Sequence, residues 1–220
     1  MRSEKIRKLA IIAMLCALAY IVMLFRTPPI FLPFLRYEAK DVVIAIGGFL
    51  FGPISALMMS ILVALVEMIT ATDTGPFGAI MNALTSSTFA CTAALIYKYR
   101  KTLSGAAIGL AAGIAITVPV ALLWNYLIVP LYMANTSRAD VLPLLVSAFL
   151  PFNLIKYGLS AALAMVVYKP LRIALDKSRL LPLPSDGTKA ASKINIGVLL
   201  VSMFVIATCV LYILSVLGVI

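Results

Sequence analysis

The chain has 220 residues, of which 63% are hydrophobic, and its formal net charge is +10. A soluble domain is nearer to half apolar, so this composition excludes a soluble globular domain and predicts an all-α integral membrane protein. The chain contains no histidine. That removes the commonest metal ligand and general base, and no metal site is expected.

Seven apolar segments follow one another along the chain. They cover about residues 9–25, 42–51, 54–71, 77–97, 106–133, 150–168 and 194–220. A membrane-spanning helix needs about 20 residues at about 1.5 Å each, so the second segment is too short unless its polar flank from Asp41 continues the helix. Phe51-Gly52-Pro53 is a turn signal after it, and Pro119 and Pro130 interrupt the fifth segment.

The basic residues are distributed unevenly between the connecting segments. If the N-terminus lies in the cytosol, thirteen of them fall inside, namely Arg2, Lys5, Arg7, Lys8, Lys98, Arg100, Lys101, Lys169, Arg172, Lys177, Arg179, Lys189 and Lys193. Four fall outside, namely Arg26, Arg36, Lys40 and Arg138. This bias orients membrane proteins, so the charge is interpreted as topological and not as a nucleic-acid-binding surface. We expect a six-helix membrane domain over residues 1–175, a polar cytoplasmic linker over 176–193 and an additional transmembrane helix over 194–220.

The outer loop between the first two segments, RTPPIFLPFLRYEAKD, is unusually apolar. It contains three prolines together with Phe31, Phe34 and Tyr37. A loop of this kind is interpreted as a lid folded over the mouth of the helical bundle. The alternative is an aromatic anchor at the membrane interface.

Polar residues interrupt the third and fourth segments. Glu67 lies deep in the third, where it predicts either a functional carboxylate or a structural hydrogen bond near the outer surface. Asn82, Thr85, Ser86 and Phe89 follow in the fourth at the spacing of one helix face. Such a stripe either lines a pocket or holds helices together.

The fifth and sixth segments also carry polar residues toward the outer side. Asn125 lies between Trp124 and Tyr126, and Lys156 follows Asn153 by about one helical turn. A cation within an apolar segment costs about 3 kcal/mol on insertion scales, so Lys156 is expected to face a polar site.

Four of these polar residues fall in the outer half of the bundle, namely Asn125, Asn153, Lys156 and Glu67. Their placement predicts a ligand site that faces outward beneath the first loop. Glu67 would offset the charge of Lys156 if their helices are neighbours.

In the first segment, Ala13 and Ala17 are one turn apart. Small residues at that spacing allow close approach of another helix, from a partner or from the same chain.

These features together resemble the riboflavin-binding S components of energy-coupling-factor (ECF) vitamin transporters, over about residues 8 to 175. The matching elements are the alanine spacing, FLRYEAKD, FGP, TGPFGAIMN and Asn153-x-x-Lys156. The resemblance implies a non-enzymatic, substrate-capturing subunit of the bacterial plasma membrane, with riboflavin as its transported ligand and FMN as a second candidate. Its implied partners are a transmembrane coupling subunit and two cytosolic ATPase subunits.

The resemblance also implies roles for individual residues. Asn125, Asn153 and Lys156 look like the flavin contacts, and the further substrate-binding candidates are Glu67, Tyr37, Lys40 and Asn82. Ala13 and Ala17 look like the docking face for the coupling subunit. The seventh segment departs from the six-helix pattern, and its role is open.

An S component for another vitamin is one alternative, and two other functions also compete with this interpretation. A self-sufficient secondary permease is typically built from two repeated halves with broken helices, and no convincing internal repeat is found. An intramembrane enzyme without histidine would need another centre, for which Lys156 and Ser160 are a candidate dyad.

Overall fold

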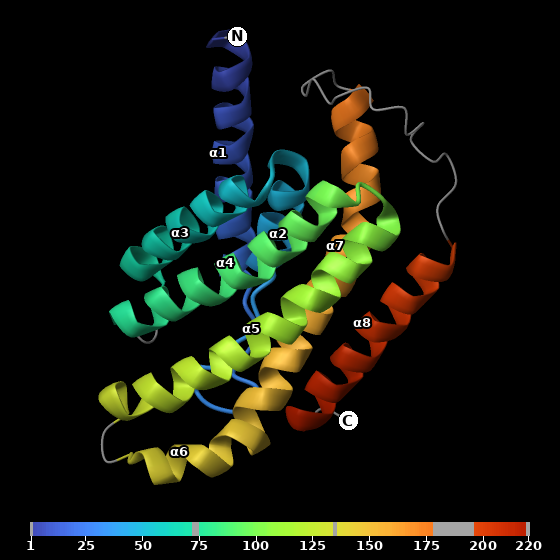
Figure 1. The fold of residues 1–220 in the computed structure, drawn as a ribbon. Helices are drawn as coiled ribbons and strands as arrows, with labels where there is room; N and C mark the ends of the chain where they lie inside the picture. The colour runs from blue at the N-terminus through green and yellow to red at the C-terminus, as the bar shows by residue number, and fades with distance from the viewer. Residues whose placement is uncertain (1, 72–74, 134–135, 178–195, 219–220) are drawn as a thin grey trace.

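The computed structural model describes residues 2–71, 75–133, 136–177 and 196–218, and this part of the chain is helical apart from its connections (Figure 1). The elements are α1 (Arg2–Leu24), α2 (Lys40–Phe51), α3 (Pro53–Thr70), α4 (Gly75–Tyr99), α5 (Leu103–Tyr132), α6 (Arg138–Leu144), the π-helical turn η1 (Leu145–Phe149), α7 (Leu150–Lys177) and α8 (Ile196–Val216).

Six stretches of helix are long and apolar enough to cross a membrane within the described ranges: Glu4–Leu24, Pro53–Thr70, Gly75–Tyr99, Leu103–Leu131, Arg138–Tyr168 and Leu199–Val216. α2 does begin in the polar flank, at Lys40, yet it has only 12 residues. At about 1.5 Å per residue this is shorter than the bilayer core of about 30 Å. Because residues 40–49 are all buried, the other helices enclose α2 and it does not need to meet lipid.

Local sequence explains where these helices begin and end. Gly52 has φ +93° between α2 and α3, a conformation that favours glycine, and Pro53 then occupies the first turn of α3. Thr102 caps α5 by accepting a hydrogen bond from the Gly105 backbone N–H. The expected interruption of α5 is not observed, because the helix continues through both Pro119 and Pro130.

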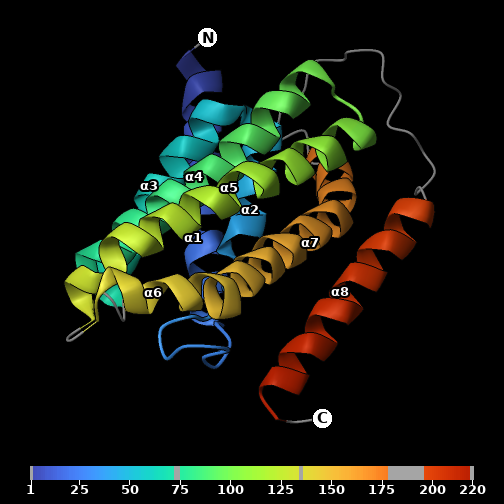
Figure 2. The same ribbon diagram turned by 60° about the horizontal axis from the view of Figure 1, so that its bottom comes forward.

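The helices form a bundle in which α4 packs between α3 and α5 and also contacts α2 (Figures 1 and 2). The contact between α4 and α5 is close. A Cβ at Gly109 would lie 2.6 Å from the carbonyl oxygen of Ala93, so a glycine is needed at this crossing. The main core surrounds α2, and within it the rings of Phe89 and Tyr157 lie 5.1 Å apart.

The loop between α1 and α2, residues 25–39, folds back onto the bundle and is called the lid loop here. Backbone hydrogen bonds from Thr27 to Tyr37 (3.1 Å) and from Ile30 to Leu35 (3.0 Å) close it on itself. Its buried members pack in a second core with Val129, Val141, Phe149, Phe152, Leu159 and Ile213. The prediction of a loop folded over the bundle mouth is confirmed, and the alternative of an interfacial anchor does not account for this burial.

The additional C-terminal helix, α8, packs along α7 on the outside of the bundle (Figure 2). Its far end reaches the lid loop, where the rings of Phe31 and Tyr212 are 6.3 Å apart and Ile213 is buried. Of the expected linker over 176–193, the first two residues end α7 and the others lie outside the described residues.

Candidate functional site

The lid loop covers the end of the bundle where α1, α3 and α5 end and α2, α4 and α7 begin (Figure 1). Polar side chains gather beneath it. We call this set the polar cluster: Glu38, Lys40, Asp41, Glu67, Asn82, Asn153 and Lys156. Glu67, Asn82, Asn153 and Lys156, which the sequence singled out on three separate segments, line one cavity of about 70 Å³. Its aromatic lining residues are Phe34, Phe77, Trp124 and Phe152.

One half of the polar cluster centres on Lys40, at the first position of α2. Its Nζ contacts Glu67 and lies 2.7 Å from Glu38 Oε2, and only 1% of the Lys40 side chain is exposed. Asn82 Nδ2 donates a hydrogen bond of 2.7 Å to Glu67 Oε1. A buried charge is tolerated only when it is paired and hydrogen-bonded, and Glu67 meets both conditions.

The other half centres on Asp41, which is completely buried. Its Oδ2 lies 3.8 Å from Lys156 Nζ, and its Oδ1 accepts a hydrogen bond from the Ser86 hydroxyl. The direct partner of Lys156 is therefore Asp41, and Glu67 offsets the charge of Lys156 only through a longer-range attraction. Successive residues of a helix point about 100° apart, so Lys40 and Asp41 of α2 meet different helices. Lys40 takes Glu67 of α3, and Asp41 takes Lys156 of α7.

Glu38 belongs to the lid loop and brings it into electrostatic contact with the bundle. Burial alone would raise the pKa of Glu38, but the Lys40 and Lys156 ammonium groups nearby reverse this and lower the pKa below its ordinary value. Glu38 is therefore ionised at neutral pH and holds the lid loop against the base of α2.

The two asparagines expected in the site differ in position. Each amide donates a 2.8 Å hydrogen bond to the preceding turn of its own helix, Asn153 to Phe149 and Asn125 to Ala121. Asn153 lines the cavity, whereas Asn125 is not on that wall and its neighbour Trp124 is. Asn125 Oδ1 is buried and has no hydrogen-bond partner among the described residues.

Buried hydroxyl groups add further hydrogen-bonding capacity beside the cluster. The hydroxyls of Tyr37 and Ser160 are buried close to each other, and neither is hydrogen-bonded to another side chain in the described part of the chain. Burial raises the pKa of Tyr37 to about 12, so its hydroxyl remains a donor. Ser160 is accordingly not hydrogen-bonded to Lys156 in this structure, and the dyad needed for an intramembrane enzyme is not formed.

Sequence reasoning missed two members of the cluster as site residues, Glu38 and Asp41. The available signal was the run of charges in FLRYEAKD immediately before an apolar helix. Charged side chains at the start of a short, enclosed helix cannot reach solvent, so they require partners of opposite charge.

Ala13 and Ala17 lie on the outer surface of α1. Ala13 and Ala17 are exposed, whereas Ile11, Ile12 and Leu15 on the other side are buried. Within the described structure, the two alanines are thus not used for packing inside the bundle.

The fold and the site define a multi-pass α-helical membrane protein with paired charges and amides buried beneath a lid at one end. The model of the family described as ECF transporter, substrate-specific component, matches residues 7–168. The chain belongs to this family. α8 lies beyond the matched residues.

Individual relatives agree with this assignment. The chain is 28% identical over 171 residues to the riboflavin transporter RibU of Staphylococcus aureus (strain TCH60), covering 75% of this chain and 90% of that protein. It is 24% identical over 184 residues to the riboflavin transporter FmnP of Bacillus subtilis (strain 168), covering 80% and 97%. A solved S component of a bacterial ECF transporter is similar with a TM-score of 0.68 at 26% identity, covering 78% of this chain and 98% of that one.

Proposed function

We propose that this chain captures riboflavin for an ECF uptake transporter and binds it beneath the lid loop. The observation that carries the proposal is the cavity lined by Glu67, Asn82, Asn153 and Lys156. Two relatives that cover most of this chain are named riboflavin transporters, which supports the choice of ligand.

The chemistry of the lining suits a flavin. Riboflavin combines a flat tricyclic ring, which needs apolar and aromatic walls, with a ribityl chain of hydroxyls, which needs fixed donors and acceptors. Trp124 and Phe152 supply aromatic surface beside the cavity. Asn153 offers both donors and an acceptor, and the Lys156 ammonium has three donors.

Binding would require the lid loop to move. The cavity of about 70 Å³ is far below the roughly 300–1,000 Å³ of pockets that enclose small molecules. The lid loop supplies one side of it through Phe34, Leu35 and Glu38. Lifting this loop enlarges the site, and closing it again sequesters the ligand from water.

The proposed orientation puts the N-terminus in the cytosol and the lid loop outside, following the positive-inside bias of the basic residues. The proposed partners are a transmembrane coupling subunit and two cytosolic ATPase subunits, with Ala13 and Ala17 as part of the docking face. The exposure of both alanines on α1 supports that role.

The proposal is tested by titrating riboflavin into the purified protein and following the quenching of flavin fluorescence. We expect saturable binding with one flavin per chain, and much weaker binding of lumichrome, which has the ring without the ribityl hydroxyls. FMN in a parallel titration tests the second candidate ligand.

A matched pair of variants locates the site. Asn153→Ala should weaken riboflavin binding about tenfold, the effect of losing one or two hydrogen bonds. Thr88→Ala is the control, because Thr88 does not line the cavity and its hydroxyl bonds to Leu84 of its own helix. Absence of saturable binding, or equal affinity for lumichrome, would contradict the proposal.

A further inference from the structure

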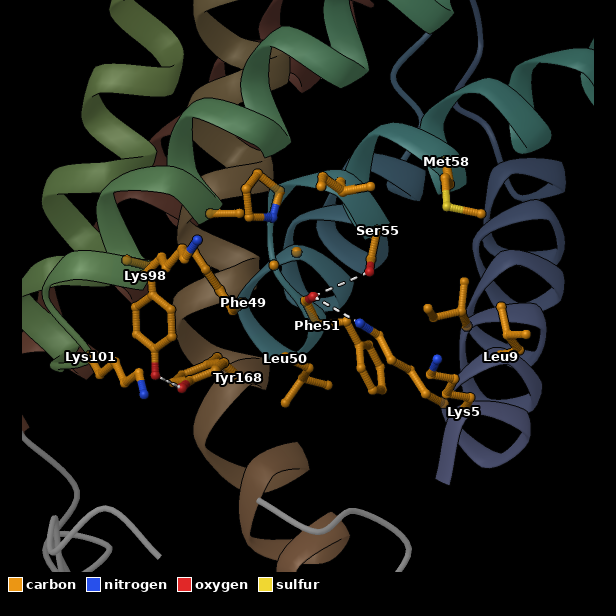
Figure 3. Close-up of a pocket in the computed structure, with 18 residues that line it drawn as sticks. Lys5, Leu9, Phe49, Leu50, Phe51, Ser55, Met58, Lys98, Lys101 and Tyr168 are labelled. Carbon is orange, nitrogen blue, oxygen red and sulfur yellow. Dashed lines mark hydrogen bonds between the residues drawn. The ribbon is translucent and has the colours of Figure 1, made fainter. Parts of the chain in front are cut away.

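A second and larger cavity lies at the opposite end of the bundle from the polar cluster (Figure 3). Its volume is about 630 Å³, which is in the range of pockets that hold small molecules. The turn Phe51-Gly52-Pro53 forms part of its wall, and residues of α1, α2, α3, α4 and α7 contribute most of the remainder. We call it the basic cavity.

The rim of the basic cavity is positively charged. Lys5, Lys8, Lys98 and Lys101 are exposed lining residues, and the described residues that line the cavity include no aspartate or glutamate. In Figure 3, Lys98 and Lys101 lie on one side and Lys5 on the other, with Phe49 between them. An anionic group entering the cavity would therefore meet cations from two directions.

The interior of the basic cavity is apolar and well supported. The ring of Phe49 packs 4.8 Å from that of Tyr97 and 5.5 Å from that of Tyr168, and the two tyrosine hydroxyls are hydrogen-bonded to each other. Leu9 and Met58, on the α1 and α3 walls, are largely exposed. The cavity thus combines a charged rim with an apolar surface that continues to the outside of the bundle.

Position at a helix C-terminus accounts for two of the four lysines, and one of these is Lys98, in the last turn of α4. Lys8 Nζ donates to the Phe51 carbonyl oxygen at 3.5 Å, at the end of α2, and lies 5.8 Å from the centre of the Phe51 ring. A cation at a helix C-terminus is favourable without any ligand. Lys5 is different, because it lies in the first turn of α1, where the helix dipole does not favour a cation, and it lines the same cavity as Lys98.

We propose that the basic cavity binds an anionic phospholipid, with the phosphate between Lys5 and Lys98 and an acyl chain along Leu9 and Met58. Basic pockets between transmembrane helices on the cytoplasmic side suit anionic headgroups. The proposed orientation places this end of the bundle at the cytoplasmic leaflet. The lipid would be a structural ligand, distinct from the transported substrate at the other end.

The test uses the full-length protein in detergent, titrated with phosphatidylglycerol or phosphatidylcholine, with bound lipids counted by native mass spectrometry. The variant is Lys5→Gln/Lys98→Gln. The matched control, Arg7→Gln/Arg100→Gln, removes the same charge from α1 and from beside the end of α4, at residues that do not line the cavity. We expect the wild type and the control to prefer phosphatidylglycerol, and the lysine variant to bind it about 30-fold more weakly.

Several results would overturn the proposal. Equal binding of both lipids by the wild type, or equal losses in the two double variants, would show that no specific site exists. Displacement of phosphatidylglycerol by inorganic phosphate at constant ionic strength would assign the cavity to free phosphate. Unchanged lipid binding in the lysine variant, with reduced recovery of the ATPase complex, would assign it to a protein partner.

Riboflavin titration of the same samples separates this proposal from the proposed function. The lysine variant should bind riboflavin as the wild type does, which also shows that it is folded. If the wild type binds no flavin, the proposed function fails while the lipid measurement still decides the role of the basic cavity.

Discussion

Lys156 and Asp41 are buried charges on different helices, and their pairing changes what removal of the lysine should do. A lone intramembrane lysine costs stability, so its loss should leave the ligand-free protein no less stable. Here its loss leaves the fully buried Asp41 with its hydrogen bond from Ser86 but without its ion-pair partner. Breaking a buried pair by removing one partner costs about 3–5 kcal/mol.

We therefore expect Lys156→Met to lower the thermal stability of the ligand-free protein, and Lys156→Met/Asp41→Asn to restore most of it. The double variant should still bind riboflavin about 10- to 150-fold more weakly, as for loss of a hydrogen bond to a charged group of about 1.5–3 kcal/mol. Thermal melts and fluorescence titrations measure the two effects separately.

Asp41→Asn alone is the control, because it keeps Lys156. If the double variant recovers riboflavin affinity together with stability, Lys156 is a structural residue and not a ligand contact.

At the scale of elements, α8 packs against the lid loop, and we expect this contact to restrain the loop. Ile213 is buried in the core that the lid loop shares with the bundle. Ile213→Ala removes up to three methyl or methylene groups at about 0.8 kcal/mol each, so the lid should open more readily and riboflavin should dissociate about tenfold faster. Stopped-flow dissociation measures this rate. Leu211→Ala, on the exposed side of the same helix, should leave the dissociation rate unchanged. Equal dissociation rates for the wild type and both variants would show that α8 does not restrain the lid loop.

The outer surface of α1 is the proposed docking face for the coupling subunit. Ala13→Trp adds bulk at an exposed position, so riboflavin binding by the isolated subunit should change by about twofold or less, whereas uptake and recovery of the ATPase complex should be lost. Ala111→Trp places the same side chain on the exposed surface of α5 and should preserve uptake. Loss of flavin binding together with uptake in Ala13→Trp would mean that the alanine supports the bundle itself.

At the scale of the whole molecule, the proposed topology predicts which loops are reachable from outside the cell. Cys16, Cys91 and Cys209 are replaced first, and single cysteines are then introduced as Arg138→Cys or Lys101→Cys. An impermeant thiol reagent should label only the Arg138 position in intact cells, because that loop lies on the lid side of the bundle. Lysed cells provide the control for reactivity at both positions. Labelling of Lys101→Cys in intact cells would show that the orientation is the reverse of the proposed one.

The sequence by itself determined the helices and the polar residues within them. Helix hydrogen bonds are local and the bilayer sets the length of a span, so apolar segments and turn signals such as Phe51-Gly52-Pro53 locate most elements. Glu67 and Lys156 stood out for the same reason, because a charge within an apolar segment is costly wherever it lies.

Only the tertiary structure decided which charges pair and which residues face the cavity. The short helix α2 places Lys40 toward Glu67 and Asp41 toward Lys156, and this depends on its rotation between its neighbours. The rotation of α5 likewise decides that Trp124 lines the cavity and that its neighbour Asn125 does not. The packing of α8 against the lid loop is likewise not encoded in local sequence, because rotations and contacts between helices follow from side-chain packing across the whole bundle.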